Sequence, residues 1–336
     1  MNAYALREGC EKAQPDWLMT AAPYLDMVER KIEATIASDV PAAYDLTMHL
    51  FSAGGKRIRP ALAILCALAS DSSASVERVI DFATATELVH MASLVHDDVV
   101  DETSERRGAP TANTIWGNKT SVLGGDFLLS KAFSLLARES DGEIMRVLAN
   151  AAVRMTEGEL LQASSEGDLA AWEVNYWSII EGKTAALMSA CCECSAIIAR
   201  APSPTRSALA QYGIQIGFAF QITDDLLDIT GDPSLTGKET GTDLMHGKFT
   251  LPVLLAIEDF DAEERRLLIE SSRTGITRDK ARETAKRVVV SGAVERARRR
   301  ADECSTKAIA QLAGLPDSEF RAALESLAGS LTGRKV

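Results

Sequence analysis

The sequence lacks several features that define whole classes of protein. Its 336 residues include 36 lysines and arginines against 48 aspartates and glutamates, which gives a formal net charge of −12. Because proteins that bind nucleic acid need a basic surface, this balance argues against nucleic acid as a partner. No apolar stretch reaches the roughly 18 uncharged residues of a transmembrane helix, so we expect no membrane span. Residues 1–16 also lack the basic and apolar segments of a signal peptide.

Cysteine is present, but without the spacing of a zinc site. Cys191, Cys192 and Cys194 lie in an apolar run of helical character, and the six cysteines form no paired C-x-x-C motifs. We therefore expect reduced, buried thiols. Together with the missing signal peptide, these thiols predict a cytoplasmic protein.

The alternating pattern of β-strands is scarce as well, and almost every segment repeats with the helical period. Hydrophobic residues make up 46% of the chain, which is enough for a large core. Asp168 is a predicted N-cap, Pro23 a predicted break, and residues 103–118 and 231–247 are predicted loops. We expect helices at residues 15–38, 41–52, 60–70, 75–102, 119–139, 142–165, 169–199 and 205–230.

No linker, low-complexity segment or internal repeat divides the chain. We therefore predict one all-α domain over residues 1–336, with an irregular extension at 1–14. Its expected form is a bundle of roughly 10–14 helices around a central cavity.

An acidic motif, D-D-x-x-D, follows an apolar run at the end of the helix predicted for 75–102. It consists of Asp97, Asp98 and Asp101, and in a helix Asp97 and Asp101 share one face. Their repulsion costs about 0.2–0.5 kcal/mol in an isolated helix, which a bound cation would offset. Oxygen ligands favour Mg²⁺, completed by water and substrate phosphate. The alternative is a solvated acidic helix end.

The same motif occurs again at Asp224, Asp225 and Asp228, behind a second apolar run at 216–220. Two acidic helix faces, each preceded by core-type sequence, suggest two helices of one bundle that face a shared cavity. Bundle cores are where carboxylate metal sites of this kind are built. Two unrelated acidic surfaces remain the alternative.

Cations gather on two turns. Gly54 and Gly55 allow a tight bend beside Lys56 and Arg59, and a second turn carries Arg106 and Arg107. Guanidinium groups bind phosphate oxygens bidentately, so the two turns suggest two anionic groups rather than two solvated loops.

A lysine also interrupts the apolar helix predicted for 169–199. Lys183 could extend to solvent, or it could contact a leaving anion. In the second case the Thr184 hydroxyl and the Gln221 amide would direct their dipoles at a transient carbocation.

These motifs resemble the trans-isoprenyl diphosphate synthases, or polyprenyl synthetases, and within them the medium- and long-chain branch. The resemblance runs from residue 40 to the C-terminus. The matching segments are G-G-K-R-I-R-P at 54–60, E-L-V-H at 87–90, H-D-D-V-V-D-E with R-R-G at 96–108, G-D-F-L-L at 125–129, E-G-E-L at 157–160, G-K-T-A at 182–185, F-Q-I-T-D-D-L-L-D at 220–228 and G-K-F-T-L-P at 247–252.

The resemblance implies an isoprenoid-synthase fold and a prenyltransferase that condenses isopentenyl diphosphate with an allylic diphosphate, head to tail. It implies about three Mg²⁺ ions on the allylic diphosphate, held by Asp97, Asp98, Asp101, Asp224, Asp225 and Asp228. The residues implied to bind isopentenyl diphosphate are Lys56, Arg59, His90 and Arg107. Those implied to contact the allylic diphosphate are Arg106, Lys183, Lys238 and Lys248. The implied catalytic residues are Arg106, Lys183, Thr184 and Gln221. Of these, Thr184 and Gln221 are implied to line the path of the allylic cation.

The resemblance also bears on product length. Short-chain members carry a bulky aromatic residue shortly before the first aspartate, whereas Ala92 and Ser93 are small here. We predict a heptaprenyl to decaprenyl product, with a farnesyl or geranylgeranyl product as the alternative. His96, beside the first motif, either contacts substrate or packs.

Two other functions compete with this one. A class I terpene cyclase ionises a diphosphate too, but it needs only one diphosphate site. A silent subunit of a two-component synthase usually loses acidic or basic motifs, and none is missing here. By analogy with the family we also expect a homodimer.

Overall fold

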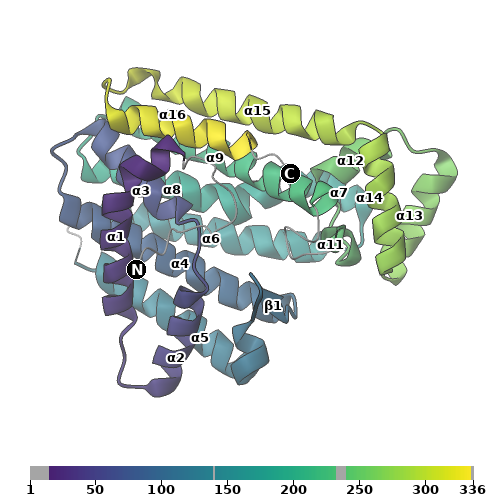
Figure 1. Cartoon of the computed structure of the whole chain (residues 1–336), viewed down its shortest axis with the longest axis horizontal. Coiled ribbons are helices and arrows are strands. Elements are labelled where there is room, and N and C mark those ends of the chain that lie inside the picture. Colours follow the sequence, from purple (N-terminus) through teal and green to yellow (C-terminus); the bar gives the residue numbers. More distant parts are fainter. Residues whose placement is uncertain (1–14, 139–140, 232–239, 334–336) are drawn as a thin grey trace. The chain divides into compact units, whose positions relative to one another are not determined.

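The computed structural model describes residues 15–138, 141–231 and 240–333. These ranges are almost entirely α-helical, with one two-stranded hairpin (Figure 1), and the all-α prediction is confirmed. The chain forms two compact units. The first comprises Met1–Val147, Cys191–Ser207 and Leu315–Leu327, and the second comprises Leu148–Ala190, Ala208–Gly314 and Ala328–Val336. The assignment of the whole chain to one domain stays a prediction.

The first unit is organised around one helix, α4 (Val76–Val100), which packs against three others: α1 (Asp16–Ile36), α3 (Ile58–Ser70) and α5 (Ala112–Leu136). A further helix, α2 (Pro41–Ser52), packs against α1 and α5. Nearly every residue of α3 is apolar and buried, as expected of a helix enclosed on all sides. Because α4 is held on three sides, the polar residues along it have fixed positions.

The helices that follow lie in the second unit or contribute residues to both units. They are α6 (Gly142–Ser165), α7 (Leu169–Ile180), the π-helical turn η1 (Glu181–Ala185), α8 (Ala186–Ile198), α9 (Ser203–Thr230), α11 (Thr242–Met245), α12 (Leu251–Ile257), α13 (Ala262–Thr274), α14 (Arg278–Val290), α15 (Ala293–Gln311), the 3₁₀ turn η2 (Leu312–Gly314) and α16 (Glu319–Thr332). Within the second unit α12 packs against α7, α14 and α15. Asp168 accepts hydrogen bonds from the N–H groups of Ala170 and Ala171, so its predicted N-cap role is confirmed.

The predicted break at Pro23 is wrong. Proline removes one backbone hydrogen bond and usually kinks or ends a helix, yet α1 runs through Pro23 from Asp16 to Ile36. The apolar face of α1 explains why the helix survives. Its fully buried side chains lie on both sides of the proline and pack into the core of the first unit: Ala21, Leu25, Val28, Ile32 and Ile36.

The loop predicted for 103–118 contains regular structure. Strands β1 (Glu105–Arg106) and β2 (Ala109–Pro110) pair antiparallel. The connecting residues, Arg107 and Gly108, both have positive φ, at 57° and 76°. Positive φ at both central residues is what a two-residue type I′ hairpin requires. The turn holds Arg107 at the tip of the hairpin.

Five cysteines, Cys66, Cys191, Cys192, Cys194 and Cys304, are buried and reduced, as predicted, and Cys10 lies outside the described residues. In the part of the chain that the structure describes, none of the helices has the length and apolarity needed to cross a membrane.

Candidate active site

The first acidic motif lies at the C-terminal end of α4, where its three aspartates have different surroundings. The carboxylate of Asp98 is buried. Its Oδ1 atom accepts hydrogen bonds from Arg106 Nε at 2.9 Å and lies 2.7 Å from Arg106 Nη2. Asp97 and Asp101 are half-buried. The structure therefore pairs two residues that the sequence assigned to different ligands, Asp98 to metal and Arg106 to the allylic diphosphate.

Cations line an open pocket in the first unit. Its polar wall includes Arg57, Arg106, Arg107 and His90, together with the acidic side chains of Glu87 and Asp98. The apolar part of the wall includes Leu50, Met91, Leu94, Ala109 and Pro110. A pocket that combines guanidinium groups with a short apolar surface suits a small molecule with a diphosphate head and a short hydrocarbon tail.

Arg59 is a further cation of the first unit, half-buried on α3. Burial lowers the pKa of its guanidinium, while the charge of Glu87 opposes that shift. Its Nε atom is buried and has no hydrogen-bond partner among the described residues. A buried N–H group without a partner is costly, so an anion that accepts from Arg59 would be stabilised.

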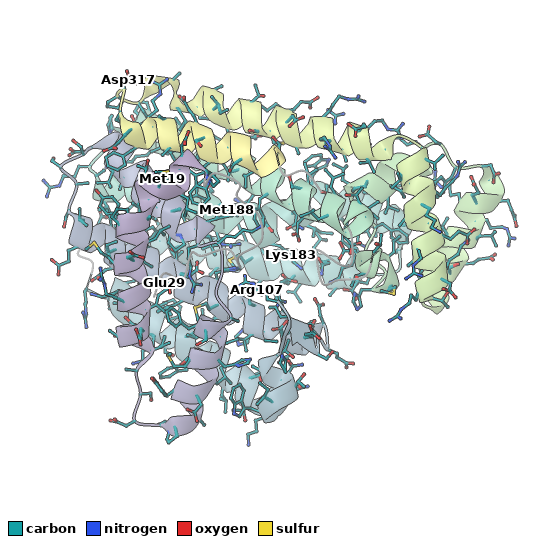
Figure 2. The ribbon with its side chains drawn as sticks, in the orientation of Figure 1. Met19, Glu29, Arg107, Lys183, Met188 and Asp317 are labelled. Atoms are coloured by element: carbon teal, nitrogen blue, oxygen red, sulfur yellow. The ribbon has the colours of Figure 1, made fainter. Side chains whose placement is uncertain are left out.

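Arg107 reaches the same region from the hairpin tip, and Figure 2 labels it. Its Nη1 atom donates a hydrogen bond to the carbonyl oxygen of Gly54. A Cβ atom on Gly55 would lie 3.2 Å from Arg107 Nη1 and 3.3 Å from Arg57 Nη1. The glycine at position 55 therefore leaves room for two guanidinium groups.

His90 lies among these cations, on α4. Burial and the neighbouring charges of Arg59, Arg107, Arg106 and Arg57 lower the pKa of His90 well below its usual value. The imidazole is therefore neutral near pH 7 and can donate one N–H group to an anion.

The second acidic motif lies on α9 in the second unit, and two of its carboxylates are enclosed. Asp225 accepts hydrogen bonds from the Tyr176 hydroxyl at 2.6 Å and from the Gln221 amide at 3.0 Å. Burial and the nearby charge of Asp243 raise the pKa of Asp225 to about 7. Asp224 of the same motif is exposed.

Asp228 shares the influence of Asp243. Its carboxylate accepts hydrogen bonds from the backbone N–H groups of Thr242 at 3.1 Å and Asp243 at 3.3 Å. Burial and the charge of Asp243 raise the pKa of Asp228 to about 8. Burial and a neighbouring negative charge favour the protonated form of both carboxyls, and a divalent cation would favour the ionised form instead.

Among the described residues, no three His, Cys, Asp or Glu side chains gather closely enough to hold a metal ion by themselves.

Lys183 and Thr184 lie on the π-helical turn η1, which interrupts the long helix predicted for 169–199. Turns of this kind are frequent at functional sites. Lys183, labelled in Figure 2, lies 2.7 Å from Glu159 Oε2 and donates to Gln162 Oε1 at 2.8 Å. Thr184 donates to the Gln221 side-chain oxygen at 2.8 Å. Thr184, Gln221, Asp225 and Tyr176 thus form one hydrogen-bonded chain.

Two glycines allow η1 to approach α6 closely. A Cβ atom on Gly182 would lie 2.7 Å from the Arg154 carbonyl oxygen, and one on Gly158 would lie 2.8 Å from the Lys183 nitrogen. These glycines belong to the E-G-E-L and G-K-T-A segments, so their presence there has a packing reason.

The remaining predicted residues divide into three groups. Lys238 lies outside the described residues, whereas Lys248 is described and donates its backbone N–H to the Asp243 carbonyl at 2.9 Å. Ala92 is buried and Ser93 half-buried on α4. His96 packs on α5, where Gly125 leaves it room and its Nε2 lies 3.2 Å from the Val122 carbonyl oxygen.

Two residues near the second motif escaped sequence reasoning. Tyr176 lies far from Asp225 in the chain, and nothing in its own segment indicates a polar partner. Asp243 belongs to the glycine-rich loop after α9. The signal that could have identified Asp243 is its acidic side chain shortly before the G-K-F-T-L-P segment at 247–252.

The chain is similar over most of its length to proteins of known function. The family model described as polyprenyl synthetase matches residues 40–289. Octaprenyl diphosphate synthase from Haemophilus influenzae is 38% identical over 308 residues, which cover 92% of this chain and 93% of that protein. All-trans-nonaprenyl-diphosphate synthase (geranyl-diphosphate specific) from Rhodobacter capsulatus is 38% identical over 312 residues, with 93% and 95% covered.

The fold is also similar to that of solved structures. The crystal structure of polyprenyl synthase from Caulobacter crescentus CB15, complexed with calcium and isoprenyl diphosphate, matches with a TM-score of 0.89 and 35% sequence identity. The match covers 97% of this chain and 100% of that one.

Proposed function

The chain belongs to the polyprenyl synthetase family, and from this premise we propose that it condenses isopentenyl diphosphate with an allylic diphosphate, head to tail and in trans geometry. It is a medium- or long-chain polyprenyl diphosphate synthase, a prenyltransferase with a product in the heptaprenyl to decaprenyl range. The names of its octaprenyl and nonaprenyl relatives support that range.

The observation that carries the proposal is the presence of both acidic motifs and both basic turns in one chain that matches the family over most of its length. One diphosphate can be held through metal by the acidic motifs, and a second directly by cations. A terpene cyclase needs only the first of these sites, and a silent subunit needs neither.

Lys56, Arg59, His90 and Arg107 are the proposed ligands of isopentenyl diphosphate. The Nε of Arg59, which has no hydrogen-bond partner in the described part of the chain, and the guanidinium group of Arg107 favour binding of an anion. His90, whose pKa is lowered by burial and by the surrounding arginines, would donate a hydrogen bond without adding charge. Leu50, Met91 and Leu94 offer an apolar surface for the isopentenyl group.

The six aspartates of the two motifs are the proposed Mg²⁺ ligands for the allylic diphosphate, and the number of ions stays a proposal. The donor set fits, because Asp225 is buried, Asp228 is half-buried, and the charge of Asp243 lies near both carboxyls, so that a cation would relieve their repulsion. When bound, Mg²⁺ would neutralise the charge that develops on the departing diphosphate.

The chain's own residues are proposed to act on the organic substrates as follows. Arg106, Lys183, Lys238 and Lys248 stabilise the leaving diphosphate electrostatically. Thr184 and Gln221 present dipoles to the allylic cation while the isopentenyl double bond attacks it. The departing diphosphate then accepts the proton that is lost, which restores the double bond. Ala92 and Ser93 leave space for the growing chain.

The cellular setting is part of the proposal. Five buried, reduced cysteines favour the cytoplasm, where thiols persist. A homodimer is proposed by analogy with the family alone.

A single assay tests the function. Purified protein is incubated with Mg²⁺, an allylic diphosphate and labelled isopentenyl diphosphate, and the products are extracted and separated. We expect label in a linear polyprenyl diphosphate. A cyclic hydrocarbon without label would identify a cyclase instead, and no incorporation by the protein alone would identify a silent subunit.

A further inference from the structure

Arg57 stands out within the basic turn because its backbone has an unfavourable conformation. It lies directly before α3 with φ 48° and ψ 38°, in the left-handed region that residues with a side chain rarely adopt. Its side chain is also almost wholly buried, at 5% exposure. A buried arginine in a strained conformation must be held in place by its surroundings.

Two carboxylates and one aromatic ring hold it. Arg57 Nε donates to Glu29 Oε1 at 2.5 Å, and Arg57 Nη1 donates to Glu87 Oε1 at 2.8 Å. The guanidinium carbon lies 5.5 Å from the centre of the Phe51 ring. Glu29, labelled in Figure 2, comes from α1, Phe51 from α2 and Glu87 from α4. Three helices therefore fix one side chain.

This arrangement borders the proposed isopentenyl diphosphate pocket. Arg57 and Glu87 both contribute to its wall, and the Arg57 charge is among those that lower the pKa of His90. The charge of Glu87 also acts on Arg59, the buried cation whose Nε lacks a partner in the described chain. The charge of Glu87 thus acts on both arginines, and Arg57 is the one that it binds.

We infer that Arg57 is a positioning residue for isopentenyl diphosphate: held by Glu29 and Glu87, it fixes the turn that carries Lys56 and Arg59 and keeps Glu87 from pairing with Arg59. This inference rests on the proposed function, and it adds Glu29 of α1 to the residues that position the site. The Nε and Nη1 groups of Arg57 donate to carboxylates, and its effect on substrate passes through Arg59.

A double substitution distinguishes a positioning role of Arg57 from direct binding of the substrate. In Arg57→Ala the Glu87 carboxylate loses its partner and competes with the diphosphate for Arg59. Removing that carboxylate as well, in Arg57→Ala/Glu87→Gln, frees Arg59 again. A direct ligand behaves differently, because its loss cannot be restored by removing Glu87.

The test measures the dissociation constant of isopentenyl diphosphate by calorimetry on the full chain, and then KM for each substrate and kcat. We expect Arg57→Ala to weaken isopentenyl diphosphate binding about tenfold or more, the size of one lost charged contact. KM for the allylic diphosphate should change less than about twofold. The double variant should recover at least half of the loss on a logarithmic scale.

Glu29→Gln tests the contribution of α1 without creating a cavity. It should weaken isopentenyl diphosphate binding severalfold, while Glu33→Gln, at an exposed position of the same helix, should have no effect. Melting temperatures identify variants that fail to fold. If Arg57→Ala fails to fold, the affinity of Glu29→Gln for isopentenyl diphosphate tests the inference.

Three outcomes overturn the inference: unchanged affinity in both Arg57→Ala and Glu29→Gln, no recovery in the double variant, or equal losses for both substrates. A wild-type chain that incorporates no label would instead contradict the proposed function. The dissociation constants measured by calorimetry still test the role of Arg57 in that case, because binding of isopentenyl diphosphate needs no turnover.

Discussion

In the metal-free protein, the buried carboxyls of the second acidic motif should make the free energy of unfolding fall as the pH rises. The pKa of Asp225 is raised from 3.8 to about 7, with burial as the largest cause. Between these values the folded chain holds a proton that the unfolded chain has released. Stability is therefore fully present below about pH 4 and declines until the pH passes about 7.

The magnitude follows from the shift. One pKa unit corresponds to about 1.4 kcal/mol, so a rise from 3.8 to about 7 gives a loss of about 4 kcal/mol for Asp225 alone. Asp228, raised to about 8, shifts the stability in the same direction. A domain has only about 5–15 kcal/mol of stability in all, so the effect is large enough to measure.

Urea unfolding at pH 5 and pH 8 in the presence of a chelator provides the assay. Asp225→Asn should exceed the stability of the wild type by about 1–2 kcal/mol at pH 5 and by about 4 kcal/mol at pH 8. Asp224→Asn, at the exposed position of the same motif, serves as the control and should retain most of the wild-type slope, because the charge of Asp224 contributes least to the raised pKa of Asp225. Equal pH slopes in the wild type and Asp225→Asn would refute the reasoning.

Three further substitutions have definite expected results. Gly182→Ala places a methyl group 2.7 Å from the Arg154 carbonyl oxygen, so urea unfolding should show a loss of about 1–3 kcal/mol; an unchanged midpoint would contradict the close packing. Glu159→Gln removes the half-exposed ion pair of Lys183 and leaves the lysine available to the allylic diphosphate. The KM for the allylic diphosphate should therefore fall about two- to fivefold in steady-state assays. A rise in that KM would contradict the proposed role of Lys183. Ala92→Phe should shorten the product seen by mass spectrometry, whereas an unchanged product at wild-type melting temperature would remove Ala92 from the chain-length pocket.

Periodicity predicted the helices well where the apolar pattern is continuous. The segments expected at 41–52 and 142–165 coincide with α2 and α6. The pattern could not predict that α1 passes through Pro23, because packing of the helix as a whole outweighs one lost hydrogen bond. It also could not predict η1, because a π-helical turn leaves the composition and the apolar spacing unchanged.

The site was predictable in its residue types but not in its partners. Two acidic motifs and two basic turns are visible in the sequence. The pairing of Asp98 with Arg106 depends on a type I′ hairpin, and the bond from Tyr176 to Asp225 joins residues of different helices. Such contacts depend on tertiary structure, for which local sequence carries no signal.

Mass spectrometry of the extracted product tests the central claim most directly. Purified protein with Mg²⁺, an allylic diphosphate and an excess of isopentenyl diphosphate should yield linear polyprenyl diphosphates from heptaprenyl to decaprenyl. A product that stops at farnesyl or geranylgeranyl diphosphate, with Ala92→Phe changing nothing, would contradict the assignment to the medium- and long-chain synthases.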